Sequence, residues 1–425
     1  MDVPVQQRLM SLVGLLAMVA IAWLLSRHRR TIPWRVIGWG LFLQLSFGVL
    51  VLKTAPGIWA FRILNDAVLS LLSFTEEGTA FVFGEFASER FTIALNVLPT
   101  IVFFSALMTI LYYLGVMQRV VSAFAWLMRR TMRTSGPETL SVAANSFVGM
   151  TEAPLMIAPF VGKMTLSELM AVMTGGFATV AGGVLAAYVG MLKDLVPNIA
   201  GHLIAASVMS APAALVVAKV MWPETEEPEG VEERATVART DDVNVLDAAA
   251  RGASEGLKLA LNVGAMLLAF IALIALANAL LGLPVHLYND WAGLDGGAAY
   301  VPITIQDILG WVFWPFAFLI GVPFGECAAV ATLLGEKIVL TEFIAYLHLS
   351  EELSTGALAL SPRTLVIVSY ALCGFANFGS IGIQLGGIGG IAPARRHDLA
   401  RLGLRAMFGG LLASLMTASV AGLLY

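Results

Sequence analysis

The sequence predicts an all-α integral membrane protein with about eight transmembrane helices, two re-entrant hairpins of opposite orientation, inverted repeats with broken helices, and an interfacial helix. Three observations support this fold class. The 425-residue chain is 58% hydrophobic and 13% charged, with a mean hydropathy of +0.84, whereas about 25% of the residues of a soluble protein are charged. Apolar runs long enough to span a bilayer recur along the chain. Three apolar segments also carry polar, glycine-rich interruptions.

Positively charged loops determine the predicted orientation of the first elements. Two spans, 12–25 and 36–52, flank a basic cluster at 27–30, so this loop is cytoplasmic and the N-terminus is outside. A cleaved signal peptide would carry its charge before the apolar run, so we expect an uncleaved first span. Residues 56–91 combine aromatic and acidic side chains, which suits a helix lying along the interface. The third span, 95–117, returns to the cytoplasm.

Segment 136–164 contains the most informative interruption, NSFVGMTEAPLMIAP. It places Asn145, Thr151 and Glu152 in apolar surroundings, where a carboxylate costs about 2.5 to 3.5 kcal/mol on insertion scales. Pro154 lacks an amide proton and favours a broken or re-entrant helix. Non-helical backbone at membrane depth is tolerated only where protein surrounds it or it lines a cavity. The segment therefore predicts a hairpin, entered from the cytoplasm, that contributes to a solute site.

Two crossings, 166–191 and 202–221, complete the first half, and the acidic stretch 222–247 follows as a cytoplasmic loop. The second half begins with an outward crossing and an external loop. A second hairpin enters from outside and contains Glu326, and an amphipathic piece, a glycine-rich crossing and a last helix follow, leaving the C-terminus outside. These elements of the second half span residues 257–281, 284–302, 307–337, 342–353, 364–391 and 402–424.

The order hairpin, interrupted crossing, simple crossing occurs in both halves, starting once inside and once outside. Inverted repeats with interrupted segments at matching positions indicate a secondary transporter whose site lies near the bilayer midplane. The predicted domains are a scaffold with the interfacial helix, a first transport repeat, the acidic loop, a scaffold span with the external loop, and a second transport repeat. Their bounds are 1–135, 136–221, 222–254, 255–304 and 305–425.

Three motifs resemble signatures of the concentrative nucleoside transporter family, which are ion-coupled nucleoside symporters. NSFVGMTEAPL is similar to the family's N-x-FVGQTEAPL, IGVPFGECA to its glutamate-bearing hairpin tip, and ALCGFANFGSIGI to its FAN-x-x-S-I segment. The resemblance covers essentially the whole chain, in the shorter bacterial layout. It implies a homotrimer in the bacterial inner membrane that imports nucleosides with sodium, by alternating access of a hairpin-bearing domain against a scaffold.

The resemblance also implies roles for individual residues. The nucleobase would contact Met150, Thr151, Glu152 and Val184. The ribose would contact Glu326, Phe375, Asn377 and Ser380. Sodium would be held by Asn145, Val148, Thr179 and Val180. The chemistry of these groups agrees, because hydroxyls of ribose suit a carboxylate, an amide and a hydroxyl, and oxygen ligands suit a hard cation.

Two departures from the family pattern leave base selectivity open. Met150 stands where the family has a base-contacting glutamine, and Gly325 stands where others carry an asparagine or an acid. A site built on hydrogen bonds discriminates more sharply than one built on shape. Met150 is therefore compatible with packing on a base face, with tolerance of purines, with a modified nucleoside or with a different polar solute.

Structural roles for the same residues remain alternatives. The two acids could pair with other helices, the amides and Ser380 could bond between helices, and Thr179 could satisfy its own helix backbone. Gln384 suits either a pocket or a packing bond. Cys327 and Cys373 lie in apolar stretches and carry no metal or disulfide motif.

Competing functions are a membrane enzyme, a passive channel and a proton-coupled symporter. No HExxH zinc motif and no GxSxG nucleophile motif occurs in the sequence. No basic cluster suggests nucleic acid, and the net charge is only -4. Paired inverted hairpins favour alternating access over a channel.

Overall fold

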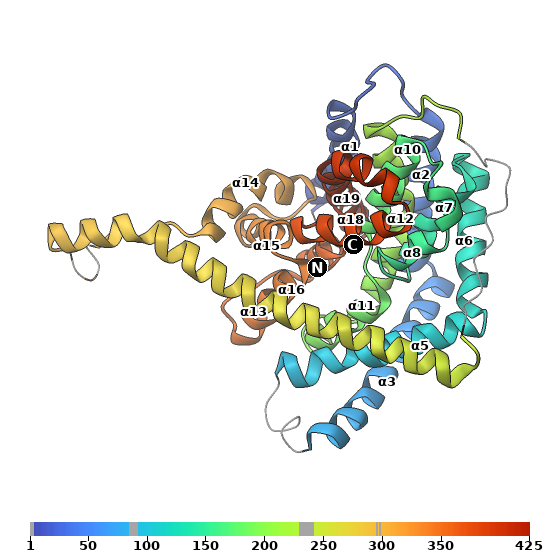
Figure 1. Cartoon of the computed structure of the whole chain (residues 1–425). Coiled ribbons are helices and arrows are strands. Elements are labelled where there is room, and N and C mark those ends of the chain that lie inside the picture. Colours follow the sequence, from blue (N-terminus) through green and yellow to red (C-terminus); the bar gives the residue numbers. More distant parts are fainter. Residues whose placement is uncertain (1–3, 85–91, 229–241, 295, 297–298) are drawn as a thin grey trace.

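The computed structural model describes residues 4–84, 92–228, 242–294, 296 and 299–425, and all regular structure in these ranges is helical (Figure 1). The first half contains α1 (Val5–Leu24), α2 (Trp34–Lys53), α3 (Ala55–Phe83), the π-helix η1 (Ile93–Val97), α5 (Leu98–Tyr113), α6 (Val116–Met132), α7 (Gly136–Asn145), α8 (Glu152–Leu155), α9 (Ala158–Val161), α10 (Leu166–Ala178), α11 (Gly182–Leu192) and α12 (Ile199–Met221). The second half contains α13 (Val245–Ala292), α14 (Ile305–Leu319), η3 (Phe324–Glu326), α15 (Cys327–Val339), α16 (Glu342–Thr355), α17 (Pro362–Leu372), α18 (Phe378–Ile391), η4 (Pro393–Arg395) and α19 (Arg396–Leu424).

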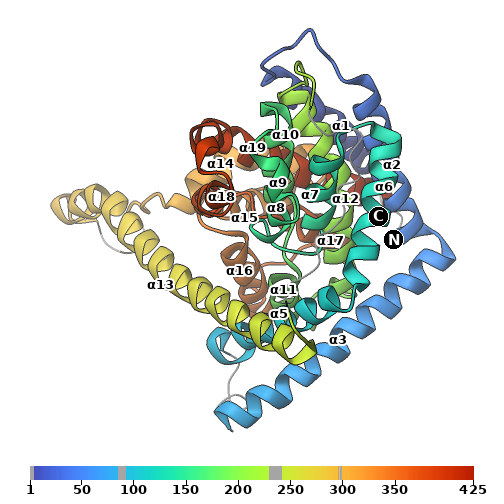
Figure 2. The same cartoon turned by 45° about the vertical axis from the view of Figure 1, so that its right-hand side comes forward.

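The described residues include eight helical stretches that are long and apolar enough to cross a membrane, which confirms the predicted class. They form an inner bundle and an outer set. In α10 with α11 and in α12, 89% of the most apolar window is buried, whereas α13 buries 11%. Helix α19 packs against α1, α10, α12 and α17 and so occupies the middle of the bundle (Figure 2). The 29-residue α3 is one of the eight helices that are long and apolar enough to cross a membrane. Its placement along the membrane interface stays a prediction.

Both predicted polar-interrupted crossings are broken helices. The first is interrupted at 179–181, between α10 and α11, and the second at 373–377, between α17 and α18. The first hairpin segment is also interrupted, at 146–151, between α7 and the short helices α8 and α9. We call these interruptions the α10–α11 break, the α17–α18 break and the α7–α8 break. Their occurrence confirms the broken helices, and the inverted orientation of the repeats stays a prediction.

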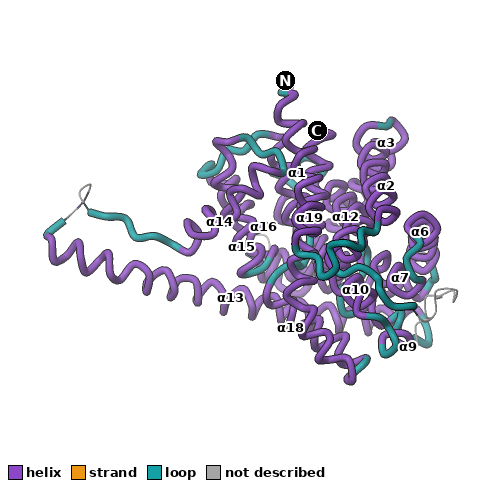
Figure 3. Tube along the Cα trace, turned by 90° about the horizontal axis from the view of Figure 1, so that it is seen from above, coloured by secondary structure: helices purple, strands orange, loops and turns teal. Residues whose placement is uncertain are grey.

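The predicted external loop at 284–302 is wrong in its first part, because α13 continues to Ala292. Pro284 lies inside this 48-residue helix, where it removes only one backbone hydrogen bond, and the apolar flanking residues continue the helix. The helix also begins at Val245, within the segment predicted as acidic loop. At 1.5 Å per residue α13 is about 72 Å long. Its far end extends away from the bundle (Figure 3).

The amphipathic helix α6 was not predicted, since its arginines were read only as markers of the cytoplasmic side. It packs against α2, α5 and α7, with Met117, Val121, Ala125 and Met128 buried. Arg129 and Arg130 lie in its last turn, where positive charge complements the helix dipole.

The second hairpin consists of α14 and α15, which pack against each other. The turn between them needs a glycine, because Gly321 has φ +95° and a Cβ there would lie 2.0 Å from Ser11 Oγ. The buried Arg363 of α17 holds this turn in place. Its guanidinium donates to the carbonyls of Gly321 and Gly422 and, at 2.8 Å, to Ser11 Oγ. It thereby joins the hairpin turn to α1 and α19.

We predict that Gly321→Ala destabilises the protein strongly, because a residue forced into a left-handed conformation costs about 1 to 3 kcal/mol before the steric clash is counted. Gly325→Ala is the matched control, since no atom lies within 4 Å of its Cβ position. Thermal unfolding followed by fluorescence-detected size exclusion measures both variants. Equal midpoints for the two variants would contradict the role assigned to this turn.

Candidate functional site

Helix α7 ends, directly before the α7–α8 break, in a buried amide whose polar atoms lack partners among the described residues. Asn145 is 1% exposed, and neither Oδ1 nor Nδ2 has a hydrogen-bond partner among the described residues. More than nine in ten buried polar groups are hydrogen-bonded, and leaving one unpaired costs about 1 to 3 kcal/mol. Asn145 therefore keeps hydrogen-bonding capacity that the described residues do not use.

The α10–α11 break lies against this amide-bearing segment. The Gly182 amide donates to the Phe147 carbonyl at 3.2 Å, which joins the two breaks directly. Ser146 and Ser207 exchange side-chain to backbone bonds of 3.2 and 2.9 Å, which fix the α7–α8 break to α12. The structure thus brings together the segments that carry the four predicted sodium ligands. Thr179 and Val180, on the α10–α11 break, are both buried.

Thr179 satisfies its own helix and still suits a cation. Its hydroxyl donates to the Gly175 carbonyl at 2.9 Å, as the structural alternative predicts. A hydroxyl that donates its proton keeps two lone pairs. The two interpretations of this residue are therefore compatible.

The α17–α18 break presents a buried polar group that is held on both sides. Asn377 caps α18, with Oδ1 accepting from the Ser380 amide at 2.8 Å. Its Nδ2 donates to Glu342 Oε2 at 2.9 Å, and Tyr188 donates to Glu342 Oε1 at 2.8 Å. Asn377, Ser380 and Glu342 are at most 4% exposed. Three elements, α11, α16 and the α17–α18 break, therefore meet at one carboxylate.

Glu326 bonds to Ser361, the residue that caps the start of α17. Its carboxylate accepts from the amide of Ser361 at 3.3 Å and from the hydroxyl of Ser361 at 3.1 Å. The carboxylate that contacts Asn377 is Glu342, which the sequence reasoning did not select. It was treated as the first residue of an amphipathic piece, although the rule that flagged Glu326, an acid within an apolar segment, applies equally to KIVLTEFIAYL.

The predicted base-binding residues lie around the α7–α8 break. Met150 is 7% exposed, and Thr151 approaches Gly387 of α18, where a Cβ would lie 2.7 Å from Thr151 Cγ2. Glu152 is exposed, and its carboxylate covers Gly149. Val184 is buried in α11, and Phe375 is half-buried in the α17–α18 break. The segment around the α7–α8 break therefore packs on α18, the helix that Asn377 caps.

Comparison with known proteins identifies the family. Family models for the N-terminus and C-terminus of Na+ dependent nucleoside transporters match residues 13–86 and 202–422, and a model described as nucleoside recognition matches 94–195. An uncharacterized transporter of Haemophilus influenzae is 44% identical over 423 residues, covering 98% of this chain and 97% of that protein. This chain belongs to the sodium-dependent nucleoside transporter family.

Other members of the sodium-dependent nucleoside transporter family agree. Sodium/nucleoside cotransporter 1 of Mus musculus is 44% identical over 431 residues, covering 99% of this chain, and the chain spans 64% of that protein's length. The relatives of this chain are transporters and not enzymes, which excludes the membrane-enzyme alternative.

Solved structures of CNTnw share the fold. An inward-facing substrate-bound state has a TM-score of 0.88 and 43% identity, covering 98% of this chain and 97% of that one. A variant in an outward-facing state has a TM-score of 0.90 and 42% identity, covering 99% of this chain and 98% of that one. Both states score almost equally, so this chain shares the fold that is common to them.

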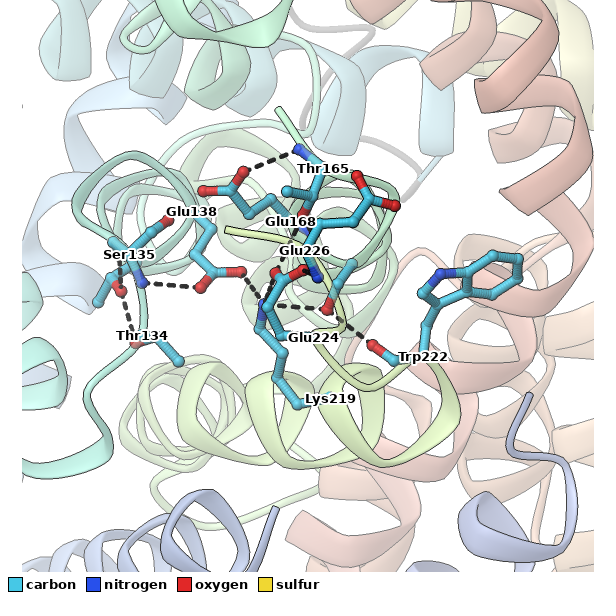
Figure 4. A network of polar contacts seen from close by, with 11 residues as sticks. Thr134, Ser135, Glu138, Thr165, Glu168, Lys219, Trp222, Glu224 and Glu226 are labelled. Atoms are coloured by element: carbon cyan, nitrogen blue, oxygen red, sulfur yellow. Dashed lines mark hydrogen bonds and ion pairs between the residues drawn. The ribbon is translucent and has the colours of Figure 1, made fainter. Parts of the chain in front are cut away.

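Lys219, Glu138 and Glu224 form a buried charge cluster near the start of the first hairpin (Figure 4), and it was not predicted from the sequence. Lys219 Nζ lies 2.8 Å from Glu138 Oε2 and 3.2 Å from Glu224 Oε2, and it donates to Ser167 Oγ at 3.0 Å. Glu138 also accepts from the Ser135 amide at 2.8 Å. The cluster connects α7, α10 and α12 with the beginning of the acidic loop.

We predict that Lys219→Met destabilises the protein by about 3 to 5 kcal/mol, since it leaves the Glu138 carboxylate buried without its partner. Adding Glu138→Gln should recover much of this loss, because both charges are then absent. Thermal midpoints of the single and double variants measure the effect. No recovery in the double variant would show that Lys219 acts through groups other than Glu138.

Proposed function

We propose that this chain imports nucleosides by symport with sodium, by alternating access of a hairpin-bearing domain against a scaffold. Two findings support it: the family membership and the named activity of the mouse relative. The observation that carries the sodium assignment is the buried Asn145 amide, which has no hydrogen-bond partner in the part of the chain that the structure describes. Its oxygen, the Thr179 hydroxyl and backbone carbonyls of Val148 and Val180 form the all-oxygen set that a hard cation prefers.

Coupling between ion and substrate follows from chain connectivity. Asn145 ends α7, Val148, Met150 and Thr151 follow in the α7–α8 break, and Glu152 begins α8. A cation that holds the first two residues also fixes the backbone that carries the base-binding residues. Ion binding therefore raises nucleoside affinity, and by linkage the nucleoside raises ion affinity by the same factor.

We assign the ribose to Asn377, Ser380 and Glu342. Asn377 keeps one amide N–H beyond its bond to Glu342, and the Glu342 oxygens offer further lone pairs to a sugar hydroxyl. A carboxylate forms stronger hydrogen bonds than a neutral acceptor. The predicted contact of Glu326 with ribose stays a prediction, and variants of the two acids distinguish it from this assignment.

The assembly we propose is a homotrimer in a bacterial inner membrane, with both termini outside. The outer helix α13 supports it, because Leu261, Leu268, Leu276 and Leu280 are 56 to 76% exposed on a single copy. Native mass spectrometry in detergent tests the trimer.

Uptake of labelled uridine and adenosine into proteoliposomes tests the function. An inward sodium gradient should drive accumulation above equilibrium, and replacing sodium by choline at fixed pH should abolish it. Uptake that persists in choline and is lost with a protonophore would indicate proton coupling instead. Uptake that only equilibrates would indicate a channel.

We predict that Glu342→Gln weakens apparent nucleoside affinity by about 10- to 100-fold, because hydrogen bonds to charged groups contribute about 1.5 to 3 kcal/mol. Glu326→Gln is the comparison and should change affinity little. Concentration dependence of uptake at saturating sodium measures both. The reverse ranking would return the ribose role to Glu326.

We predict that Asn145→Ala raises the sodium concentration for half-maximal uptake by about tenfold, the effect of losing about 1.4 kcal/mol of ligand interaction. Nucleoside affinity at saturating sodium should change less. Asn278→Ala is the control, since its amide already donates to Gln306 at 3.0 Å. An unchanged sodium dependence in Asn145→Ala would remove this residue from the ion site.

A further inference from the structure

Gln384 continues the polar face of α18 that begins with the proposed ribose residues. Asn377, Ser380 and Gln384 are spaced by three and four residues, so they lie on one side of the helix. All three side chains are at most 2% exposed. This face therefore carries buried polar groups over two helical turns, beyond the residues assigned to ribose.

The far end of this polar face meets the proposed base-binding segment. A Cβ on Gly176 of α10 would lie 2.6 Å from Gln384 Nε2 and 3.0 Å from Met150 Cβ. One turn further along α18, Gly387 is in contact with Thr151. The amide of Gln384 is thus a neighbour of Met150, with the glycine of α10 providing the space for both.

The amide of Gln384 has unused hydrogen-bonding capacity. Its Nε2 donates to the Met173 carbonyl at 3.1 Å, whereas its Oε1 is buried without a partner among the described residues. A primary amide has two N–H donors and two acceptor lone pairs, so one donor and the carbonyl oxygen remain. Among the described residues, Gln44 Oε1 is also buried without a partner. Gln384 differs from Gln44 in its position beside Met150.

We propose that Gln384 recognises the nucleobase, and that its amide replaces the one lost where Met150 stands in this chain. This inference rests on the proposed function. The free carbonyl oxygen and N–H suit a base edge on which a donor adjoins an acceptor, an arrangement found in uracil, cytosine, adenine, guanine and hypoxanthine. Met150 then contributes apolar contact with the base face. Base selectivity in this protein comes from α18 as well as from the α7–α8 break.

Calorimetric binding to the purified full-length chain at saturating sodium tests this role. The probes are uridine, cytidine, adenosine, inosine and guanosine, with 3′-deoxyuridine reporting on ribose recognition. Gln384→Met removes the amide at similar volume. The ratio between the best and the worst base should fall about tenfold, the effect of one buried hydrogen bond. The penalty for 3′-deoxyuridine should not change.

Two further variants separate recognition from packing. Adding Met150→Gln to Gln384→Met should restore discrimination between bases, because an amide returns to the same space. Gln44→Met removes another buried glutamine, bonded to Thr417 at 3.0 Å, and should leave the base profile unchanged. If Gln384→Met does not fold, Gln384→Glu retains the acceptors and should favour bases that present donors.

An unchanged base profile in Gln384→Met would overturn the inference. Equal weakening of all nucleosides, with no restoration by Met150→Gln, would also overturn it and assign Gln384 to packing. If the unaltered chain bound none of the nucleosides, the proposed function itself would fail, and this inference with it.

Discussion

Hydrogen bonding at interrupted helices is the constraint on which this structure depends. Each break exposes backbone and side-chain polar groups inside an apolar bundle, where they need partners. Asn377 meets this requirement within the protein, because it caps α18 and donates to Glu342. Asn145 does not, since both of its polar atoms are buried and have no partner among the residues that the structure describes. The two amides therefore differ in their hydrogen bonding: the protein fixes the amide of Asn377 in place, whereas the amide of Asn145 keeps its donors and acceptor unused among the described residues.

Helices α10 and α18 pack against each other and against the helices that flank the α7–α8 break. Gly176 and Gly387 allow Met150, Thr151 and Gln384 to approach the neighbouring backbone. The buried cluster of Lys219 with Glu138 and Glu224 fixes the beginning of the hairpin that leads to Asn145. Rigid helices therefore position the short irregular segments and the polar groups that these segments carry.

Composition and polar interruptions were sufficient to predict the membrane class and the broken helices, whereas the family was inferred from the resemblance of three motifs. The predicted segments that bear sodium ligands are joined in the structure by the Gly182 to Phe147 bond. Element ends were less predictable, because the apolar sequence around Pro284 allows α13 to continue where a loop was expected. Glu342 was overlooked for a different reason. The hairpin motif at Glu326 drew the assignment, and only the fold brings α16 to the α17–α18 break.

The guanidinium of Arg363 has a consequence for biosynthesis. It connects the turn of the second hairpin to Ser11 near the beginning of the chain and to Gly422 near its end. During insertion, α1 is in the bilayer before most of the polypeptide has been made, and its Ser11 can bond to Arg363 only after α17 has been synthesised. The earliest span to leave the ribosome is therefore among the last to complete its contacts in the folded bundle.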